Sequence, residues 1–327
     1  MTRTTAGIPT PSAQKRIITQ LAEIERAGGE GTVTLGRGAT LTVSNLGKSL
    51  FGKGGATKGD VMRYYTWAAP YALPLMKDRA LSLKRFPNGI SAPFFYQQKA
   101  PPEAPSAVRV ERLLNEQGEA QERLVGGSLA TLLYCVQLGA IEVNPWNARV
   151  KSLEYPDFTV IDLHPGPRAP YARVVETALW VRDVLKAHGL HGAVKTSGSS
   201  GMHVFIPLPP KTPEDVAVRL AVRIAVEVTL AHPKETTVER SLKARKPGQI
   251  YVDAGQNSRG KTVAAAYSVR AKRGATVSTP LRWEELTPAL NPSAYTIETL
   301  PQRVERLGDL WGEAMRRPNP RRTVTGT

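Results

Sequence analysis

Three short segments of the chain combine acidic residues, a histidine and a glycine-rich turn in a way that suits a metal-dependent site. They read DLHPG from Asp162, SGSSGMH from Ser197, and YVD ending at Asp253. Each follows or lies within a run of β-forming residues, which predicts that the acidic groups stand at strand ends. Carboxylates beside a glycine-rich turn can hold divalent cations against a triphosphate. We therefore predict that Asp162 and Asp253 are the bridging carboxylates of a nucleotidyl transfer site.

A third ligand is predicted from strand geometry. His164 follows Asp162 by two residues, so in an extended segment both side chains face the same way. Imidazole nitrogen suits Mn²⁺ or Co²⁺ better than Mg²⁺, which prefers oxygen. The predicted metal ligands are Asp162, His164 and Asp253, with Mn²⁺ as the expected ion and Mg²⁺ or Co²⁺ as alternatives.

The order of these motifs, with the later segments YSVRA and PLRWEEL, resembles the polymerase domain of bacterial ligase D. That domain is a branch of the archaeo-eukaryotic primase-polymerase superfamily, and the likeness extends from about Thr42 to about Leu286. The family pattern is Asp-x-Asp, then Ser-Gly-x-Lys-Gly-x-His-Val, then an apolar strand ending in Asp. This chain departs from the pattern at three positions. His164 replaces the second Asp, Ser200 replaces the Lys, and Asn144 replaces the His of Gly-Ala-Ile-Glu-x-His.

The resemblance implies further site residues. Expected nucleotide-binding positions are Ser197, Gly198, Ser199, Gly201, His203, Gln256, Arg270 and Lys272. Expected contacts to a DNA 5′-phosphate are Asn45, Lys48 and Lys58. The residue types agree with these roles, because backbone N–H groups of a glycine turn form an anion nest. An amide and two ammonium groups beside a helix N-terminus likewise suit a dianion.

One aromatic residue has two open interpretations. Phe86 lies between Lys84-Arg85 and a Pro-Asn-Gly turn, which suits stacking on a template base. A phenylalanine in this setting can equally anchor the core.

Composition indicates an anionic partner. The chain has 44 Lys and Arg against 28 Asp and Glu, a net charge of +16, and nucleic acid is the natural partner for such an excess. From Arg240 to Arg273 nine basic residues surround a single acid, Asp253. No apolar run approaches the roughly 20 residues of a membrane span, and the N-terminus has no signal-peptide core. We expect a cytoplasmic, nucleoid-associated protein, in which Cys135 is a buried residue without a disulfide.

The elements predict an α/β primase-polymerase fold with an RRM-like palm, in which mixed or antiparallel sheets are flanked by helices. Three parts are expected: a helical arm over 1–29, a catalytic domain over 30–311, and a basic disordered tail over 312–327. The catalytic domain divides into lobes of about 30–139 and 140–311.

Helix boundaries follow from capping signals. Predicted helices cover Pro11–Arg26 with Ser12 as cap, a segment opened by Thr57 that Pro70 and Pro74 kink or break, and two palm helices. The palm helices cover about 170–188 and 216–230, the second capped by Thr212, and the first palm strand ends at Asp162.

The function that follows from the resemblance is a template-dependent polymerase that fills gaps or extends broken DNA ends, with recognition of the 5′-phosphate. The resemblance implies a role in non-homologous end joining, nucleoside triphosphates as substrates, and Ku and a separate DNA ligase as partners. Two alternatives stay open: a DNA-end-binding protein of the same fold with weakened or lost catalysis, and a primase. His164 and Ser200 distinguish the first alternative from the polymerase.

Overall fold

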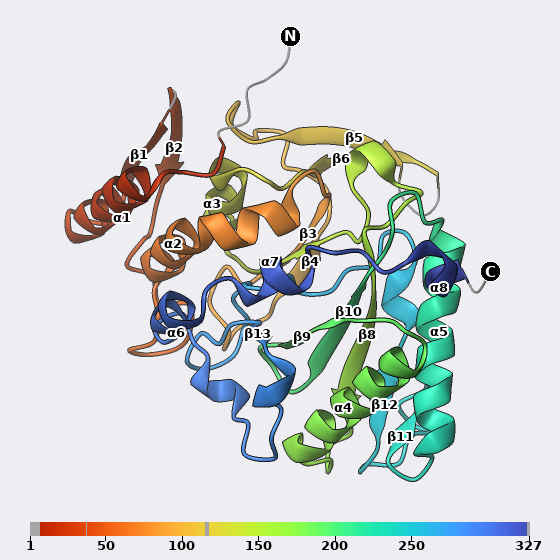
Figure 1. Cartoon of the computed structure of the whole chain (residues 1–327). Coiled ribbons are helices and arrows are strands. Elements are labelled where there is room, and N and C mark those ends of the chain that lie inside the picture. Colours follow the sequence, from red (N-terminus) through yellow and green to blue (C-terminus); the bar gives the residue numbers. More distant parts are fainter. Residues whose placement is uncertain (1–6, 37, 115–117, 326–327) are drawn as a thin grey trace.

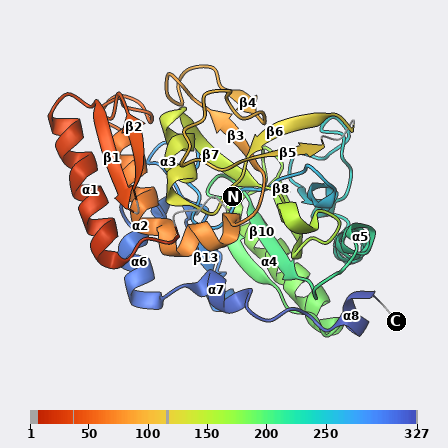
Figure 2. The ribbon, with the colours of Figure 1, turned by 90° about the horizontal axis from the view of Figure 1, so that it is seen from above.

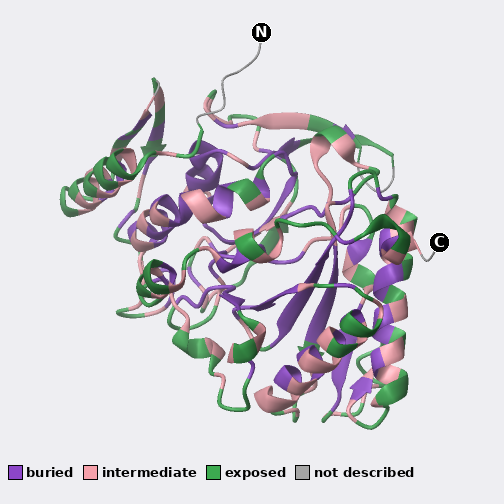
Figure 3. Cartoon of the chain, in the orientation of Figure 1, coloured by how far each residue is buried: buried purple, intermediate pink, exposed green. Residues whose placement is uncertain are grey.

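A six-stranded sheet of mostly buried residues forms the palm (Figures 1 and 3). The computed structural model describes residues 7–36, 38–114 and 118–325. The strand order is β11 (Thr236–Thr237), β12 (Ile250–Asp253), β8 (Phe158–Pro165), β10 (Met202–Pro207), β9 (Ala193–Thr196) and β13 (Pro280–Leu281). Neighbouring strands are antiparallel except β11 and β12, which are parallel. The predicted α/β fold with mixed and antiparallel sheets is confirmed.

The two faces of the palm sheet have different roles. Helices α4 (Tyr171–Ala187) and α5 (Glu214–Ala231) pack on one face, where Ile161 and Leu163 of β8 join their apolar side chains in one core cluster. Because side chains alternate along a strand, Val160, Asp162 and His164 point to the other face. Val160 there belongs to the second, larger core cluster.

The N-terminal half supplies most of that larger cluster. Its elements are α1 (Pro11–Arg26), β1 (Gly31–Gly36), β2 (Ala39–Val43), α2 (Lys58–Met76), β3 (Leu81–Arg85), β4 (Phe95–Gln97), β5 (Val110–Leu114), β6 (Ala120–Leu124), α3 (Leu129–Gln137) and β7 (Ala140–Pro145). Strand β7 pairs with β3 in the sheet β4-β3-β7, so it belongs to this half although the predicted lobe boundary lies before it. Helix α1 and the β1–β2 hairpin lie at one end of the molecule, and α5 at the opposite end (Figures 1 and 2).

Helix α2 begins as its sequence predicts. The Thr57 side chain accepts from the Asp60 N–H and the Asp60 carboxylate accepts from the Thr57 N–H, which closes the capping box. Pro70 and Pro74 lie inside a helix that continues to Met76, so the prolines do not break it.

Three predicted boundaries need correction. The cap of α1 is Thr10, not Ser12. The N-cap of α5 is Pro213, and the Thr212 hydroxyl donates to the carbonyl of Pro209 instead. Strand β8 does not end at Asp162 but continues to Pro165, because pairing with β12 extends past that residue.

The C-terminal segment is ordered where the structure describes it, which contradicts the predicted disorder of the tail. After α6 (Leu300–Leu307), two short helices, α7 (Leu310–Ala314) and α8 (Arg321–Thr325), run along the palm (Figure 2). Trp311 and Val324 are buried, and the Asn319 amide donates to the carbonyls of His191 and Pro207. Asn319 lies between the two arginine pairs of the tail, and the buried Trp311 and Val324 lie outside these pairs, one on each side. Short 3₁₀ turns complete the chain at Val150–Ser152, Gly255–Asn257, Trp283–Glu285 and Pro292–Ala294.

No helix in the described ranges combines the length and apolar character needed to cross a membrane. Cys135 is a free, buried thiol on α3, as predicted.

Candidate metal and nucleotide site

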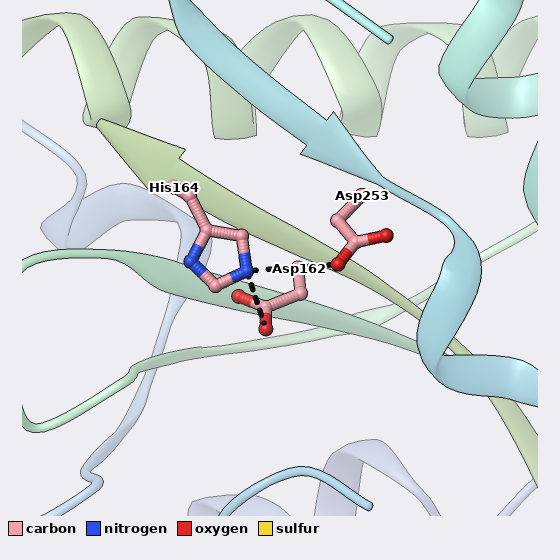
Figure 4. A group of neighbouring side chains, drawn as sticks. All are labelled: Asp162, His164 and Asp253. Atoms are coloured by element: carbon pink, nitrogen blue, oxygen red, sulfur yellow. Dashed lines mark ion pairs between the residues drawn. The ribbon is translucent and has the colours of Figure 1, made fainter. Parts of the chain in front are cut away.

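The register of the palm sheet brings the three predicted metal ligands together. Asp253, the last residue of β12, pairs directly with Asp162 of β8, and His164 lies two residues further along β8 on the same face. One ligand atom from each residue can be chosen so that all lie within 4.8 Å of one another. The three side chains converge from two neighbouring strands (Figure 4).

Hydrogen bonding and charge couple the three groups. The His164 Nε2 atom lies 3.0 Å from Asp162 Oδ2 and 3.8 Å from Asp253 Oδ2. Burial alone would raise the pKa of Asp162, but the His203 and His164 rings outweigh it and hold this pKa well below its usual range. Burial would lower the pKa of His164, whereas its hydrogen bond to Asp162 and the two carboxylate charges raise it overall. The Asp162 carboxyl group therefore stays ionised.

The donor set fits a divalent ion. It consists of two carboxylates and one imidazole, the carboxylates are buried, and the His164 side chain is 47% exposed. This mixture of oxygen and nitrogen suits Mn²⁺ or Co²⁺ better than Mg²⁺.

Asp253 is held by a set of donors that the sequence did not reveal. Its Oδ1 accepts from the Tyr251 hydroxyl at 2.9 Å and from the Gly255 N–H at 2.7 Å. Its Oδ2 accepts from the Gln256 side chain at 3.0 Å. Gln256, predicted as a nucleotide contact, thus lies beside the candidate metal site and hydrogen-bonds the predicted ligand Asp253. Such outer contacts fix ligand geometry in metal sites.

The Tyr251 ring also contacts the His164 ring and the Arg245 guanidinium group. It pairs with His164 across the strands, with ring centroids 5.9 Å apart and planes 20° apart. The Arg245 guanidinium lies 3.6 Å from the Tyr251 ring centroid. Burial and the neighbouring Asp253 raise the pKa of Tyr251 to about 12, so its hydroxyl keeps the proton that it donates. The alternation of Tyr251 with Asp253 was the only sequence signal for this role.

The glycine-rich turn is built around Ser197. Its hydroxyl accepts from the N–H groups of Ser199 and Gly201, both at 3.1 Å, so part of the predicted nest is satisfied internally. Gly198 has a φ of +70°, and a Cβ there would meet Arg270 at 2.6 Å, so this turn requires glycine. Ser200, two residues after Gly198, is exposed.

Arg270 is fixed against this turn, and Lys272 is not. One Arg270 nitrogen donates to the Ser197 carbonyl at 2.9 Å, and another pairs with Glu142 at 3.2 Å. The Lys272 side chain is exposed. The structure therefore gives only Arg270 a defined position beside the turn.

His203 of β10 lies directly opposite Asp162 of β8, and each of its ring nitrogens contacts a neighbouring side chain. Nε2 lies 3.2 Å from Asp162 Oδ1, and Nδ1 lies 2.6 Å from the Lys195 Nζ atom. Lys195 is completely buried and also donates to Ser278 Oγ, whose own hydroxyl donates to the Thr196 carbonyl. A donating Lys195 leaves the ring proton of His203 on Nε2, directed at Asp162.

The buried lysine changes the charge of its neighbour. Burial and Lys195 lower the pKa of His203 to about 4, and burial lowers the pKa of Lys195 well below its usual range. The neutral His203 ring can contact a triphosphate only by leaving Asp162, so its nucleotide role stays a prediction. Sequence reasoning missed Lys195, although a lysine in the middle of the strand segment AVKTS was a visible signal.

The three predicted 5′-phosphate residues lie around the start of α2. Lys58 is nearly buried, and its ammonium group donates to the carbonyls of Ser44 and Gln137 at 3.1 and 3.3 Å. The Lys58 N–H donates to the Lys48 carbonyl, while Lys48 Nζ reaches Asn88.

Burial lowers the pKa of Lys58, and the nearby positive charge of Lys48 adds to the effect. Asn45 has a φ of +56° in the turn before Lys48. Lys48 and Lys58 thus lie beside the N-terminus of α2, where positive helix-dipole charge adds to their own, and their contact to a 5′-phosphate stays a prediction.

The exposed aromatic rings near Lys84 are Phe94 and Tyr96, and Phe86 itself is buried. Phe86 is 4% exposed and belongs to the core, which supports the anchor interpretation over template stacking. Phe94 and Tyr96, by contrast, are 47% and 65% exposed. The Lys84 ammonium group lies 4.0 Å from the Phe94 ring centroid, so cations and exposed rings do meet here.

Comparison with known proteins identifies the family. The family described as LigD, primase-polymerase domain, matches residues 57–311. The chain belongs to this family. The match agrees with the resemblance seen in the motifs, and it extends beyond Leu286 through α6 and into α7.

Curated LigD relatives have similar sequences over most of this chain. The multifunctional non-homologous end joining protein LigD of Pseudomonas aeruginosa is 33% identical over 267 residues, 79% of this chain and 31% of the relative. The bifunctional LigD of Bacillus subtilis is 31% identical over 279 residues, 85% of this chain and 44% of the relative. The chain thus spans about a third to under half of these LigD proteins.

A solved LigD domain has the same fold. The polymerase domain from Mycobacterium tuberculosis ligase D, in complex with DNA, matches with a TM-score of 0.77 and 30% sequence identity. The match covers 86% of this chain and 99% of the solved domain. It confirms the predicted primase-polymerase fold, while the roles of individual site residues stay predictions.

Proposed function

We propose that this protein is a template-dependent nucleotidyltransferase that fills gaps or extends broken DNA ends during non-homologous end joining. One observation carries the proposal: a member of the LigD primase-polymerase family places two buried carboxylates and a histidine together on adjacent palm strands. This arrangement suits the transfer of a nucleotide to a primer 3′-hydroxyl.

The metal ligands would be Asp162, His164 and Asp253, with Mn²⁺ as the preferred ion. A bound divalent ion supplies acidity to the 3′-hydroxyl and neutralises triphosphate charge. Within the chain, Tyr251 and Gln256 orient Asp253 by hydrogen bonds. Arg270 offers a guanidinium beside the glycine turn, where a triphosphate would lie.

DNA would bind through charge and stacking. The net charge of +16 favours nucleic acid, and the cluster of Asn45, Lys48 and Lys58 provides the recognition of a 5′-phosphate. Exposed Phe94 and Tyr96 provide the surface on which template bases would stack. We extend the proposal to nucleoside triphosphates as substrates and to Ku and a separate ligase as partners, in the cytoplasm and at the nucleoid.

A second function is favoured by the three departures from the family pattern. His164 takes the place of a carboxylate and hydrogen-bonds Asp162, Ser200 replaces the lysine of the turn, and Asn144 replaces a histidine. A site poorer in charge would leave a DNA-end-binding protein with weak or no catalysis. Primer synthesis is the third alternative for the same residues.

Primer extension separates these functions. The substrate is gapped DNA with or without a 5′-phosphate, in Mg²⁺ or Mn²⁺, with each nucleoside triphosphate. We expect extension in Mn²⁺ that is faster on the 5′-phosphorylated gap, and loss of extension in Asp162→Asn and Asp253→Asn with DNA binding retained. Asp215→Asn, which removes an exposed carboxylate on α5, is the matched control. Tight binding to the gap without extension in either ion would instead establish the end-binding function.

A further inference from the structure

A cavity of about 680 Å³ lies between the N-terminal half and the palm, away from the metal site. Its walls come from the end of α2, the turn at Val150–Ser152, the first residue of β8, the end of β10 and the segment after α7. Phe158 and Phe205 line it from the same sheet face as Asp162. At about 3.3 Å per residue, Phe158 lies roughly 13 Å along β8 from Asp162. None of the three metal ligands lines this cavity.

The interior of the cavity is apolar and aromatic. The rings of Phe158 and Phe205 are 4.7 Å apart, and the Trp311 ring meets Phe205 edge-on at 4.8 Å. Ala265 and Ala266 leave space beside them. Buried Pro145, Pro156 and Pro207 add rigid wall segments, so little conformational entropy is lost when a ligand enters.

The buried polar side chains among the described lining residues already have hydrogen-bond partners. Arg79 is buried in the wall, but its guanidinium already donates to the carbonyls of Leu75, Trp146 and Asn147 and to the Asp157 carboxylate. No described lining residue has a buried polar side-chain atom without a partner. A base would lose hydrogen bonds to water on entry, whereas an apolar body would not.

The mouth of the cavity is positively charged. Lys151 and Lys211 are exposed there, and their ammonium groups make no hydrogen bond or ion pair with a described residue. The single acid of the lining, Asp157, is already paired with both Arg79 and Arg149. An anion held at the mouth therefore meets two available cations and no free carboxylate.

We propose that this cavity binds a small amphipathic anion. The ligand has an acyl or aromatic body that fills the apolar interior and one carboxylate, sulfonate or phosphate group held by Lys151 and Lys211. The volume lies within the roughly 300–1,000 Å³ range of small-molecule sites. The Phe205 ring, which lines the cavity, has its centroid 6.3 Å from that of the His203 ring, so the bound ligand would lie next to the strand that carries His203.

Binding is measured by calorimetry with decanoate and by fluorescence with anilinonaphthalene sulfonate, with decanol as the uncharged counterpart. We expect one saturable site for each anion. Changing both Lys151 and Lys211 to Gln should lower the affinity for decanoate on the order of tenfold, because a charge-assisted hydrogen bond is lost. The affinity for decanol should stay the same. Lys186→Gln, an exposed lysine at the end of α4, is the matched control and should bind as wild type does.

Filling the cavity tests the place of binding. Leu75→Trp and Met315→Trp enlarge partly buried lining residues, and each should weaken the binding of all three probes. The Lys151/Lys211 double variant and the Lys186→Gln control change only exposed side chains, so both retain the native core. Equal decanoate affinity in wild type and both filled variants would overturn the proposal. Displacement of anilinonaphthalene sulfonate by single-stranded DNA in the Asp162→Asn protein would also overturn it, by assigning the cavity to the nucleic-acid path. These readouts involve no extension reaction, so their outcome is separate from that of the proposed function.

Discussion

Replacing His164 by aspartate should make the metal-free protein less stable and its response to Mg²⁺ larger. The His164 Nε2 atom lies 3.0 and 3.8 Å from the two carboxylates, so a third carboxylate there converts two favourable contacts into repulsions. At an effective dielectric constant of about 20, unit charges about 4 Å apart interact by about 4 kcal/mol. Since the His164 side chain is 47% exposed, solvent screening reduces the total to about 1–2 kcal/mol.

That energy corresponds to a measurable shift in the unfolding temperature. With an unfolding entropy of about 2.1 cal/mol/K per residue, a chain of 327 residues changes its Tm by about 1.5 °C per kcal/mol. We therefore expect His164→Asp to unfold about 1.5–3 °C below wild type in chelator near neutral pH. Added Mg²⁺ should raise the Tm of the variant more than that of wild type, because a carboxylate is the better ligand for this ion. Wild type should respond more to Mn²⁺ than to Mg²⁺.

His164→Asn is the matched control, because it removes the ring without adding charge. Primer extension in Mg²⁺ should increase in His164→Asp and not in His164→Asn. Identical Tm values for His164→Asp and wild type in chelator, with identical gains in Mg²⁺, would refute a shared ion site at these three residues.

Three further predictions concern the surroundings of this site. Changing Lys48 and Lys58 to Ala should abolish the preference for 5′-phosphorylated gaps and lower the salt slope of DNA binding by about two; fluorescence anisotropy that still shows the preference would contradict the assignment. Tyr251→Phe keeps the ring but removes the hydroxyl that Asp253 accepts from, so Mn²⁺ affinity measured by calorimetry should fall about tenfold, and an unchanged affinity rules out an orienting role. In chelator, wild-type stability should fall as pH drops from about 6.5 to about 4, because unfolded His203 binds a proton that the folded ring, with its lowered pKa, does not. Denaturant titrations of His203→Gln should show a flatter slope over this window, and a slope equal to that of wild type would count against the buried neutral ring.

Local sequence rules predicted the features that depend on neighbours in the chain. The two-residue alternation was enough to place Asp162 and His164 on one face, and the Thr57–Asp60 capping box is present as expected. The acidic strand ends beside a glycine-rich turn predicted that Asp253 joins them, and the β8–β12 register places Asp253 directly opposite Asp162.

Features set by long-range packing were beyond these rules. Phe86 and Phe94 both lie near basic residues, and only the packing of Phe86 against the core separates the buried ring from the exposed one. Lys195 hydrogen-bonds His203 because the pairing of β9 with β10 places the two residues side by side. Pro213 is the N-cap of α5 because the Thr212 hydroxyl donates to the carbonyl of Pro209 instead of capping the helix. Pairings of this kind depend on residues distant in sequence or on loop geometry.

Four polar side chains of the palm lie in one row across four adjacent strands. Lys195 of β9 pairs with His203 of β10, His203 with Asp162 of β8, and Asp162 with Asp253 of β12. Adjacent strands in a sheet are about 4.8 Å apart, and that spacing is fixed by backbone hydrogen bonds. Because these residues lie on paired strands, loop movement cannot change the distances between them to suit a different ion. Exchange of a side chain is the remaining means of adjustment, and His164 beside Asp162 and Asp253 is a change of that kind, which would shift ion preference while the framework stays in place.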